Sequence, residues 1–334
     1  MKIVFLLIIF ISYALGDTLK IATYNVENLF DLQKSGHEYK EFIPYSYSKW
    51  NKKNYTIKLK NIAKVIKNID ADIIALQEIE SLQALKDLRY MLKRKGLYYK
   101  YYAIANLKET TVKVALLSKI PFVYTHEIAV QSSYRYRNIL EAKLKLKNGE
   151  DLFILVNHWK SKSGPESMRL ISAKALKKRV KELGYDKNII ALGDFNSHYE
   201  EYKTFKRKRR LNDTNDITGI NHILGTIYYQ ESVKNINRIE DGDFYNLWYD
   251  IPEEKRYTHT YKKYKEALDS ILITKALLDG KGIDYVPHSL HPFEASYLFY
   301  KNHIYRWQMT RRKKSKHKGK GYSDHLPLIA KFKY

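Results

Sequence analysis

The 334-residue sequence contains no cysteine, few prolines and glycines, and no long apolar stretch after its first residues. Without cysteine, the protein has no disulfides, no thiol nucleophile and no Cys-ligated zinc. Its 7 prolines and 14 glycines form no linker, and no internal repeat is present, so we expect one domain over residues 17–334. A convincing Gly-x-Ser-x-Gly elbow is also missing, which argues against a serine nucleophile of that type.

The first 16 residues are the strongly apolar part of the sequence. Lys2 supplies a positive charge, residues 3–13 an apolar core, and Ala14-Leu15-Gly16 the small residues that a signal peptidase reads. An uncleaved membrane anchor is the alternative, but the segment is shorter than the roughly 20 residues that a span needs. We therefore expect a secretory signal peptide over residues 1–16 and an exported protein that is periplasmic, surface-held or secreted. No later segment is long and apolar enough to be transmembrane.

Positive charge is in large excess. The sequence has 60 lysines and arginines against 36 acidic residues, a formal net charge of +24. Such an excess favours a polyanionic partner, namely nucleic acid, an anionic membrane or an acidic polysaccharide. General lysine abundance is the alternative explanation, but basic residues crowd into 206–210 and 311–320, and the second run ends close to Asp324. We therefore expect a polyanion-binding surface beside the site, contacting phosphate through Arg311, Arg312, Lys313 and Lys314.

Apolar periodicity predicts helices that alternate with buried strands. The helices are expected over 55–69, 81–95 and 166–183, with Ser81 as an N-cap and Gly184 ending the third. Segment 202–265 is polar and turn-rich and is expected to hold a short helix and long loops. Hairpin-linked and crossover-linked strands together indicate a mixed sheet, or two sheets, clad in helices. The predicted strands are 19–24, 71–76, 98–105, 112–117, 123–129, 139–146, 151–157, 188–192, 268–274 and 326–332.

Six short polar motifs follow these segments, most of them at the end of an apolar run. Because the ends of the buried strands should meet at one edge of a sheet, their Glu, Asp, Asn and His side chains should gather there. That set of side chains suits hydrolysis of a phosphate ester by water and a divalent cation. The motifs are Tyr24-Asn25-Val26-Glu27-Asn28, Leu76-Gln77-Glu78, Asn157-His158-Trp159, Gly193-Asp194-Phe195-Asn196, Leu268-Asp269-Ser270 and Ser323-Asp324-His325.

Each residue type has a chemical use in such a cluster. Glu78 offers a hard oxygen ligand for Mg²⁺, Mn²⁺ or Ca²⁺. Asp194 and Asn196 pair a carboxylate that orients water with an amide that donates to a phosphoryl oxygen. Asp269 is placed to hold His325 in one tautomer. Taken alone, each has a structural explanation, such as a helix start, an Asx turn or a core histidine, so the prediction rests on the whole set.

The order of these residues resembles the endonuclease/exonuclease/phosphatase superfamily with the deoxyribonuclease-I-like fold. Segments 157–162 and 321–328 further resemble a bacterial branch of secreted or surface nucleases. The resemblance implies an α/β (α+β) four-layer sandwich, in which two mixed β-sheets pack face to face with helices outside and the site at one end. Ser270 stands where the family often has a bulky or aromatic residue, which affects the expected fit around the scissile group.

The resemblance also implies a role for each residue. The expected metal ligands are Glu78, Asn25 and Asp324, and the expected phosphate contacts include Arg137 and, two residues after His158, Lys160. Asp194 would orient or deprotonate the attacking water, and Asn196 would hold the phosphate. The remaining roles, transition-state stabilisation and protonation of the leaving oxygen, fall to His158 and to His325 fixed by Asp269.

These observations together predict an exported metal-dependent phosphodiesterase, and specifically a nuclease with little sequence preference. Metal-activated water would be the nucleophile, DNA the favoured substrate and endonucleolytic cleavage the expected mode. Mg²⁺ is the expected cation, with Mn²⁺ or Ca²⁺ as alternatives, and the chain is expected to act as a monomer. Tyr322 and Trp307 are the aromatic candidates for base stacking.

Two other interpretations stay open. A lipid phosphodiesterase of sphingomyelinase type would need an apolar loop at the lipid interface, for which segment 297–300 is the candidate. A basic surface protein that binds DNA or acidic glycan without turnover is the second alternative.

Overall fold

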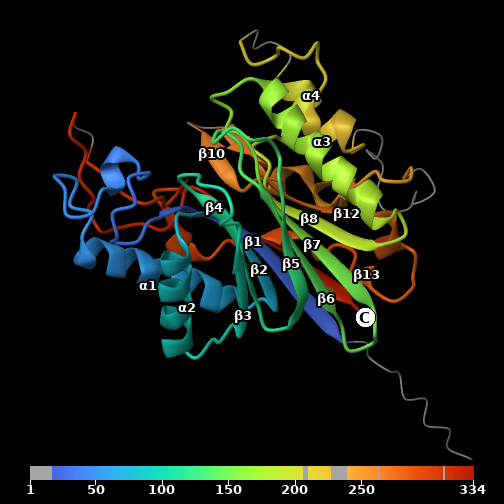
Figure 1. Ribbon diagram of the computed structural model, residues 1–334, viewed down its shortest axis with the longest axis horizontal. Coiled ribbons are helices and arrows are strands. Elements are labelled where there is room, and N and C mark those ends of the chain that lie inside the picture. The colour runs from blue at the N-terminus through green and yellow to red at the C-terminus, as the bar shows by residue number, and fades with distance from the viewer. Residues whose placement is uncertain (1–16, 206–209, 227–238, 262–263, 311–312) are drawn as a thin grey trace, which may run out of the picture.

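The computed structural model describes residues 17–205, 210–226, 239–261, 264–310 and 313–334 (Figure 1). The expected signal peptide, Arg311, Arg312 and most of the first basic run therefore lie outside the described residues. Within the described part of the chain, no helix is both long enough and apolar enough to cross a membrane.

The first sheet contains seven strands in the order β13-β17-β1-β2-β4-β3, with β14 also paired to β17. β1 is parallel to β2, and the other pairs are antiparallel. The sheet is therefore mixed, as its hairpin and crossover connections predict. Its strands are β1 (Thr18–Leu29), β2 (Ile73–Ile79), β3 (Tyr101–Ile104), β4 (Lys113–Ser118), β13 (Asp284–Tyr285), β14 (His291–Pro292) and β17 (Leu328–Lys333).

The second sheet contains six strands in the order β5-β6-β7-β8-β12-β9. It has one parallel pair as well, between β7 and β8, while its other neighbours are antiparallel. Each sheet thus has one parallel pair near its middle, and residues at the ends of both pairs contribute to the site. The strands are β5 (Phe122–Ile128), β6 (Ile139–Lys145), β7 (Asp151–His158), β8 (Asn188–Asp194), β9 (Tyr245–Asn246) and β12 (Asp269–Ile273).

The two sheets pack face to face, and alternation along the strands decides which side chains meet. Ile21 and Ile73 of the first sheet share the inter-sheet core with Ile154 and Ile190 of the second. Their neighbours along the strands point outward, because successive side chains of a strand face opposite sides. Burying both inner faces is the main apolar contribution to stability.

Helices cover the two outer faces (Figure 1). α1 (Lys52–Ile69) and α2 (Leu82–Arg94) pack on the first sheet through the outward side chains of β1, β2 and β4. α3 (Glu166–Leu183) packs on the second sheet through the outward side chains of β7 and β8. The resulting order of layers, helix, sheet, sheet and helix, confirms the predicted four-layer sandwich.

Local capping agrees with the sequence signals. Ser81 caps α2, with its hydroxyl accepting a hydrogen bond from the Ala84 backbone N–H at 3.0 Å, which satisfies one of the otherwise unpaired amides of the first turn. α3 begins at Glu166 and ends at Leu183, where Gly184 adopts a φ of +111°. Both predictions are confirmed.

Segment 202–265 differs from the expectation of one short helix and loops. Besides α4 (Glu201–Thr204) it holds the π-helical turn η2 (Gly219–Ile223), β9 and the hairpin β10 (His259–Tyr261) and β11 (Tyr264–Glu266). Strands of two or three residues are too short to show an alternating apolar pattern, so periodicity missed them. The other short elements are η1 (Lys40–Phe42), η4 (Leu247–Asp250), η5 (Glu253–Lys255), η6 (Lys275–Leu278), η7 (Ser296–Leu298), β15 (Phe299–Tyr300) and β16 (His303–Ile304).

Gly193 occupies a position that only glycine tolerates. Its φ is +135°, and an added Cβ would lie 2.0 Å from the Asn157 carbonyl oxygen of the neighbouring strand. We expect Gly193→Ala to lower the free energy of unfolding by more than about 3 kcal/mol, because backbone strain and a backbone clash add. Gly96→Ala is the matched control, since Gly96 has a φ of +80° and open space around it; it should cost about 1 kcal/mol. Urea denaturation of both variants would measure the difference, and equal losses would contradict the clash.

Candidate active site

The predicted site residues of the first sheet lie where β1 and β2 end. The parallel strands β1 and β2 pair Asn25 with Gln77. Beyond this pair the register is irregular, both between β1 and β2 and between β2 and β4. Glu78 lies in this irregularity with a φ of +66°, and Glu27 and Asn28 also have positive φ values. Irregularities of this kind redirect side chains at a sheet edge. Here the backbone turns Glu78 toward Asn25, whose amide donates a hydrogen bond to the Glu78 carboxylate at 3.1 Å.

The second sheet brings its residues to the same end of the sandwich. β7 and β8 place His158 directly beside Asp194, and β12 places Asp269 opposite Asp194. Asp194 accepts a hydrogen bond from the Asn196 backbone N–H at 2.8 Å, and the Asn196 side chain donates to the Trp159 carbonyl oxygen at 3.2 Å. Three adjacent strands of one sheet therefore present a histidine and two carboxylates at one edge.

Asn25 joins the two sheets at this point. Its side-chain nitrogen donates to Glu78 Oε1 at 3.1 Å and to Asp194 Oδ2 at 3.0 Å. His158 Nε2 lies 3.6 Å from Asp194 Oδ2 and 3.9 Å from Glu78 Oε1. The structure thus brings four of the predicted residues, from four different strands, into direct contact.

His325 is held by Asp269 from the opposite side. His325 Nδ1 lies 2.7 Å from Asp269 Oδ2, which also accepts a hydrogen bond from the Thr258 hydroxyl at 2.6 Å. A carboxylate accepts only, so Nδ1 carries a proton that it donates to Asp269, and this bond fixes the orientation of the ring. His325 Nε2 lies 4.0 Å from Asp194 Oδ2. The contact expected between Asp269 and His325 is present, and their catalytic roles stay predictions.

Burial separates the protonation properties of these groups. Desolvation raises the pKa of Glu78, and it raises the pKa of Asp194 to about 7. Burial also lowers the pKa of His158 well below its usual value. It acts in the same direction on His325, but there the nearby carboxylates, Asp269 foremost, outweigh it and raise the pKa well above the usual value. The site therefore holds one neutral and one positively charged imidazole, the kind of divergence that distinguishes acid from base.

The donor set fits a hard divalent cation. Asp194 and Asp269 each offer a carboxylate oxygen in a cluster whose polar atoms, with a ring nitrogen of His325, lie within 4.8 Å of one another, and the Glu78 carboxylate reaches the same group through Asn25. Among the described residues, Asp269 Oδ1 is buried and has no hydrogen-bond partner. Carboxylate oxygens are the ligands that Mg²⁺, Mn²⁺ and Ca²⁺ take. The raised pKa values of Glu78 and Asp194 show that burying their negative charges is unfavourable, and a bound cation would offset that cost.

Asp324 lies in a second network that the sequence did not indicate. Its carboxylate lies 3.2 Å from the Arg306 guanidinium, which also donates to Glu27 at 2.6 Å. Buried Lys58 donates to the Glu27 carbonyl oxygen at 2.8 Å. Burial works against ionisation of Asp324, but His325 and Arg306 lower its pKa below the ordinary value. Arg306 was missed because nothing in its local sequence distinguishes it from the basic run that follows.

These side chains surround one cavity of about 580 Å³. Asn25 and Asp269 contact the lining residues from behind. Of the two lysines after His158, it is Lys162 and not the predicted Lys160 that reaches the cavity, as judged from the described residues. Arg137 also borders it and donates to the Trp159 carbonyl oxygen at 3.3 Å. The predicted residues that line the cavity are Glu78, Arg137, His158, Asp194, Asn196, Asp324 and His325.

The second basic run borders a neighbouring cavity of about 530 Å³, which shares Tyr39 with the first. Lys313 and Lys314 are exposed in the segment between the lining residues Thr310 and Ser315. Trp307 corrects an expectation: its side chain is 4% exposed and its indole donates to His317 at 2.8 Å, so it is not accessible for base stacking.

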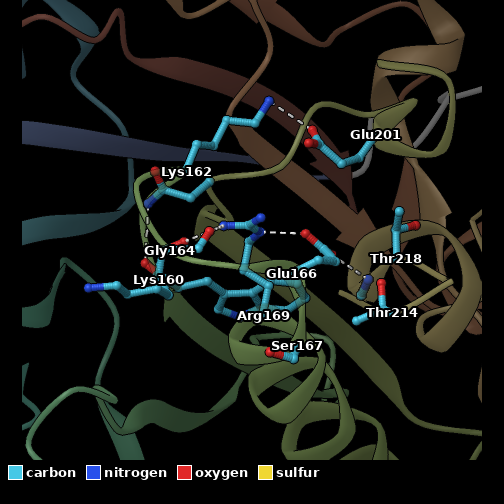
Figure 2. Close-up of polar contacts among 12 residues, drawn as sticks. Lys160, Lys162, Gly164, Glu166, Ser167, Arg169, Glu201, Thr214 and Thr218 are labelled. Atoms are coloured by element: carbon cyan, nitrogen blue, oxygen red, sulfur yellow. Dashed lines mark hydrogen bonds and ion pairs between the residues drawn. The ribbon is translucent and has the colours of Figure 1, made fainter. Parts of the chain in front are cut away.

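The loop after β7 is fixed by a buried arginine (Figure 2). Arg169 Nη1 donates to the carbonyl oxygens of Lys160, Ser161 and Gly164 at 3.2–3.3 Å. Arg169 Nε donates to Glu166 at 2.7 Å, and Glu166 in turn accepts from the Gly219 backbone N–H at 2.9 Å. We call these contacts of Arg169 and Glu166 the arginine clamp. They hold the loop that places Lys162 at the cavity.

Comparison with known proteins agrees with this geometry. The family model described as "Endonuclease/Exonuclease/phosphatase family" matches residues 20–333, so the chain belongs to that family. No curated protein matches the chain significantly.

Solved structures share the fold at low sequence identity. TDP2 from D. rerio, complexed with a single-strand DNA product, is 15% identical with a TM-score of 0.57, covering 95% of this chain and 99% of that one. An endonuclease/exonuclease/phosphatase family protein from Bacteroides thetaiotaomicron is 15% identical with a TM-score of 0.55, covering 95% of each chain. A mannosyl-6-phosphatase from the same organism is 15% identical with a TM-score of 0.53, covering 95% of this chain and all of that one (100%).

The raised pKa of Asp194 predicts a pH-dependent cost of this site in the absence of metal. Because the folded-state pKa of about 7 lies above the unfolded one, stability is lost as pH rises toward 7. Asp194→Asn removes this cost, so the variant should be more stable than wild type at pH 8, and its advantage should shrink by on the order of 2 kcal/mol at pH 5. Urea denaturation in chelator at both pH values checks this; an advantage that is constant with pH would show that Asp194 ionises normally.

Removing the arginine clamp should cost both stability and activity. Arg169→Met leaves Glu166 buried without its cation, so the free energy of unfolding should fall by about 3–5 kcal/mol. The double variant Glu166→Gln/Arg169→Met should recover part of that stability, yet not the anchoring of the loop, so its activity stays low. Lys178→Met, in an exposed pair on the same helix, should change stability by less than about 0.5 kcal/mol. Full activity of the double variant would show that the loop needs no clamp.

Proposed function

We propose that this protein is an exported, divalent-metal-dependent phosphodiesterase that hydrolyses nucleic acid, with DNA as the favoured substrate and endonucleolytic cleavage. The observation that carries the proposal is the meeting of Glu78, Asp194 and Asn25, from both sheets, beside two imidazoles in one cavity. Family membership supports hydrolysis of a phosphate ester. Export rests on the apolar segment over residues 1–16.

The residues of the cavity divide the chemistry among them. Asp194, with its pKa near 7, is suited to orient water and accept its proton. Asn196 provides an amide for a phosphoryl oxygen. His325, kept positively charged beside Asp269, stabilises charge on the phosphate or protonates the leaving oxygen, and neutral His158 contributes a hydrogen bond.

Glu78 would hold the cation, with Asn25 and Asp324 completing its surroundings. The cation would supply Lewis-acid stabilisation of the phosphate and make water a better nucleophile. Mg²⁺ is favoured because the donors are oxygens.

Charge supports a polynucleotide over a small ester. The fold alone does not decide, because similar folds occur in a TDP2 complexed with a DNA product and in a mannosyl-6-phosphatase. A net charge of +24 favours a polyanion. Exposed Lys313 and Lys314 lie next to a cavity that adjoins the site, where they would contact backbone phosphates.

Incubation of residues 17–334 with supercoiled, linear and single-stranded DNA, with and without chelator, tests the proposal. We expect nicked circles in Mg²⁺ and no product in chelator. Glu78→Gln should lower the cleavage rate by at least about 10²-fold while DNA binding survives, because the basic side chains and not this carboxylate would contact the backbone phosphates. Glu109→Gln, an exposed change, is the control and should cleave normally.

The alternatives give different results in the same assay. DNA left intact while phosphocholine is released from sphingomyelin would favour the lipid phosphodiesterase. Release of phosphate from sugar phosphates alone would indicate a monoesterase. Binding without cleavage in Mg²⁺, Mn²⁺ and Ca²⁺ would leave only the non-catalytic protein.

A further inference from the structure

A second histidine–carboxylate pair lies in the same cavity, outside all six motifs. The hairpin β10–β11 pairs His259 with Glu266, and His259 Nδ1 lies 3.2 Å from Glu266 Oε2. Both residues line the cavity. The arrangement repeats that of His325 and Asp269, in which a carboxylate fixes one ring nitrogen and thereby orients the other.

The two imidazoles are neighbours. His259 and His325 form an antiparallel β-bridge, and their ring centroids are 4.9 Å apart at an interplanar angle of 39°. His325 Nε2 in turn lies 4.0 Å from Asp194 Oδ2. His325 thus contacts Asp194 on one side and His259 on the other, and all three line the cavity.

Glu266 is itself held in place. Its Oε1 lies 3.7 Å from Lys162 Nζ, and Lys162 Nζ lies 2.8 Å from Glu201 Oε2 (Figure 2 shows the Lys162–Glu201 pair). Glu201 is 1% exposed. Because Lys162 already faces two carboxylates, this wall carries no excess of positive charge and is not an anion trap. Lys162 and Glu266 instead fix the orientation of the His259 imidazole, whose side chain is 16% exposed.

In displacement at phosphorus, the attacking and leaving oxygens are roughly in line on opposite sides of the phosphorus. Asp194 lies on the side of the attacking water under the function proposed above. An ester whose phosphorus lies between Asp194 and His259 would then turn its departing alcohol toward His259. His259 is consequently placed to meet the ester oxygen that leaves, or the sugar attached to it.

We propose that His259 is a further catalytic residue of this site, which hydrogen-bonds the leaving-group side of the phosphate ester through Nε2. Glu266 is its positioning residue, and Lys162 positions Glu266. This inference rests on the proposed phosphodiesterase function. It makes His259, in addition to His158 and His325, a determinant of which alcohols depart readily.

The test compares two diesters that differ in the leaving group: a thymidine dinucleotide, which releases an alcohol, and bis(p-nitrophenyl) phosphate, which releases a stable phenolate. His259→Ala should lower kcat on the dinucleotide by about 10- to 100-fold, since a hydrogen bond to a developing charge is lost. On the aryl ester the loss should be below about threefold, because that leaving group needs little help. KM should change little on either substrate.

Two further variants distinguish a direct contact of His259 with the substrate from a purely structural role of the residue. His259→Gln keeps a hydrogen-bonding amide and should recover most of the dinucleotide activity. Glu266→Gln should give an intermediate loss in kcat that is again confined to the dinucleotide, which a merely structural role would not produce. His291→Ala, at an exposed histidine of β14, is the control. Thermal unfolding monitors folding, and His259→Gln carries the comparison if His259→Ala fails to fold.

The outcomes are distinct. Equal losses on both esters would mean that His259 only supports the His325 ring, and no loss on either would mean that it makes no contact; both overturn the inference while leaving the proposed function standing. A wild-type protein inactive on DNA and on both diesters would end the proposed function and the inference with it. Selective loss with recovery in His259→Gln establishes the contact.

Discussion

The Asn25 side chain connects the two sheets at the point where the chemistry is expected. Its nitrogen donates to Glu78 of the first sheet and to Asp194 of the second, while its oxygen accepts from the Glu27 backbone N–H at 3.0 Å, which fixes the orientation of the amide. Both carboxylates are desolvated and have raised pKa values. The spacing of the site is consequently set by sheet-on-sheet packing, and the apolar core between the sheets is also what holds the site in register.

The site is assembled at a cost in backbone strain and charge crowding. Glu27, Asn28, Glu78 and Asn196 all have positive φ values although none is glycine, and such residues persist only where the surrounding structure holds them. The irregular ends of β1 and β2 give Glu78 its direction, and the Gly193 backbone lets β8 approach β7 closely. Local destabilisation of this kind is common where function and stability compete.

The local patterns of the sequence predicted the helices, most of the strands and the meeting of their polar ends, whereas the four-layer arrangement followed from the family resemblance carried by the six motifs. Short apolar runs such as 71–76 and amphipathic helices such as Glu166–Leu183 carry clear signals, and parallel neighbours bring their polar ends together. Arg306, His259 and Lys162 were beyond that reasoning. Arg306 reaches Asp324 only through tertiary contact, and the pairing of His259 with Glu266 follows from the register of a hairpin whose two strands have three residues each, too few for a periodic signal.

The charges of the cavity explain why a cation and a basic exterior belong together. The lining carries Glu78, Asp194, Asp324 and Glu266 against Arg137, Lys162 and the charged His325, with Asp269 directly behind. Lys162 is already engaged by carboxylates. A phosphate diester would therefore meet a repulsive interior, even though the net charge of +24 attracts it to the surface. The basic exterior can raise the local concentration of a polyanion. For one of its phosphates to enter the cavity, positive charge must be added next to the carboxylates, and a divalent cation bound by their oxygens would supply that charge.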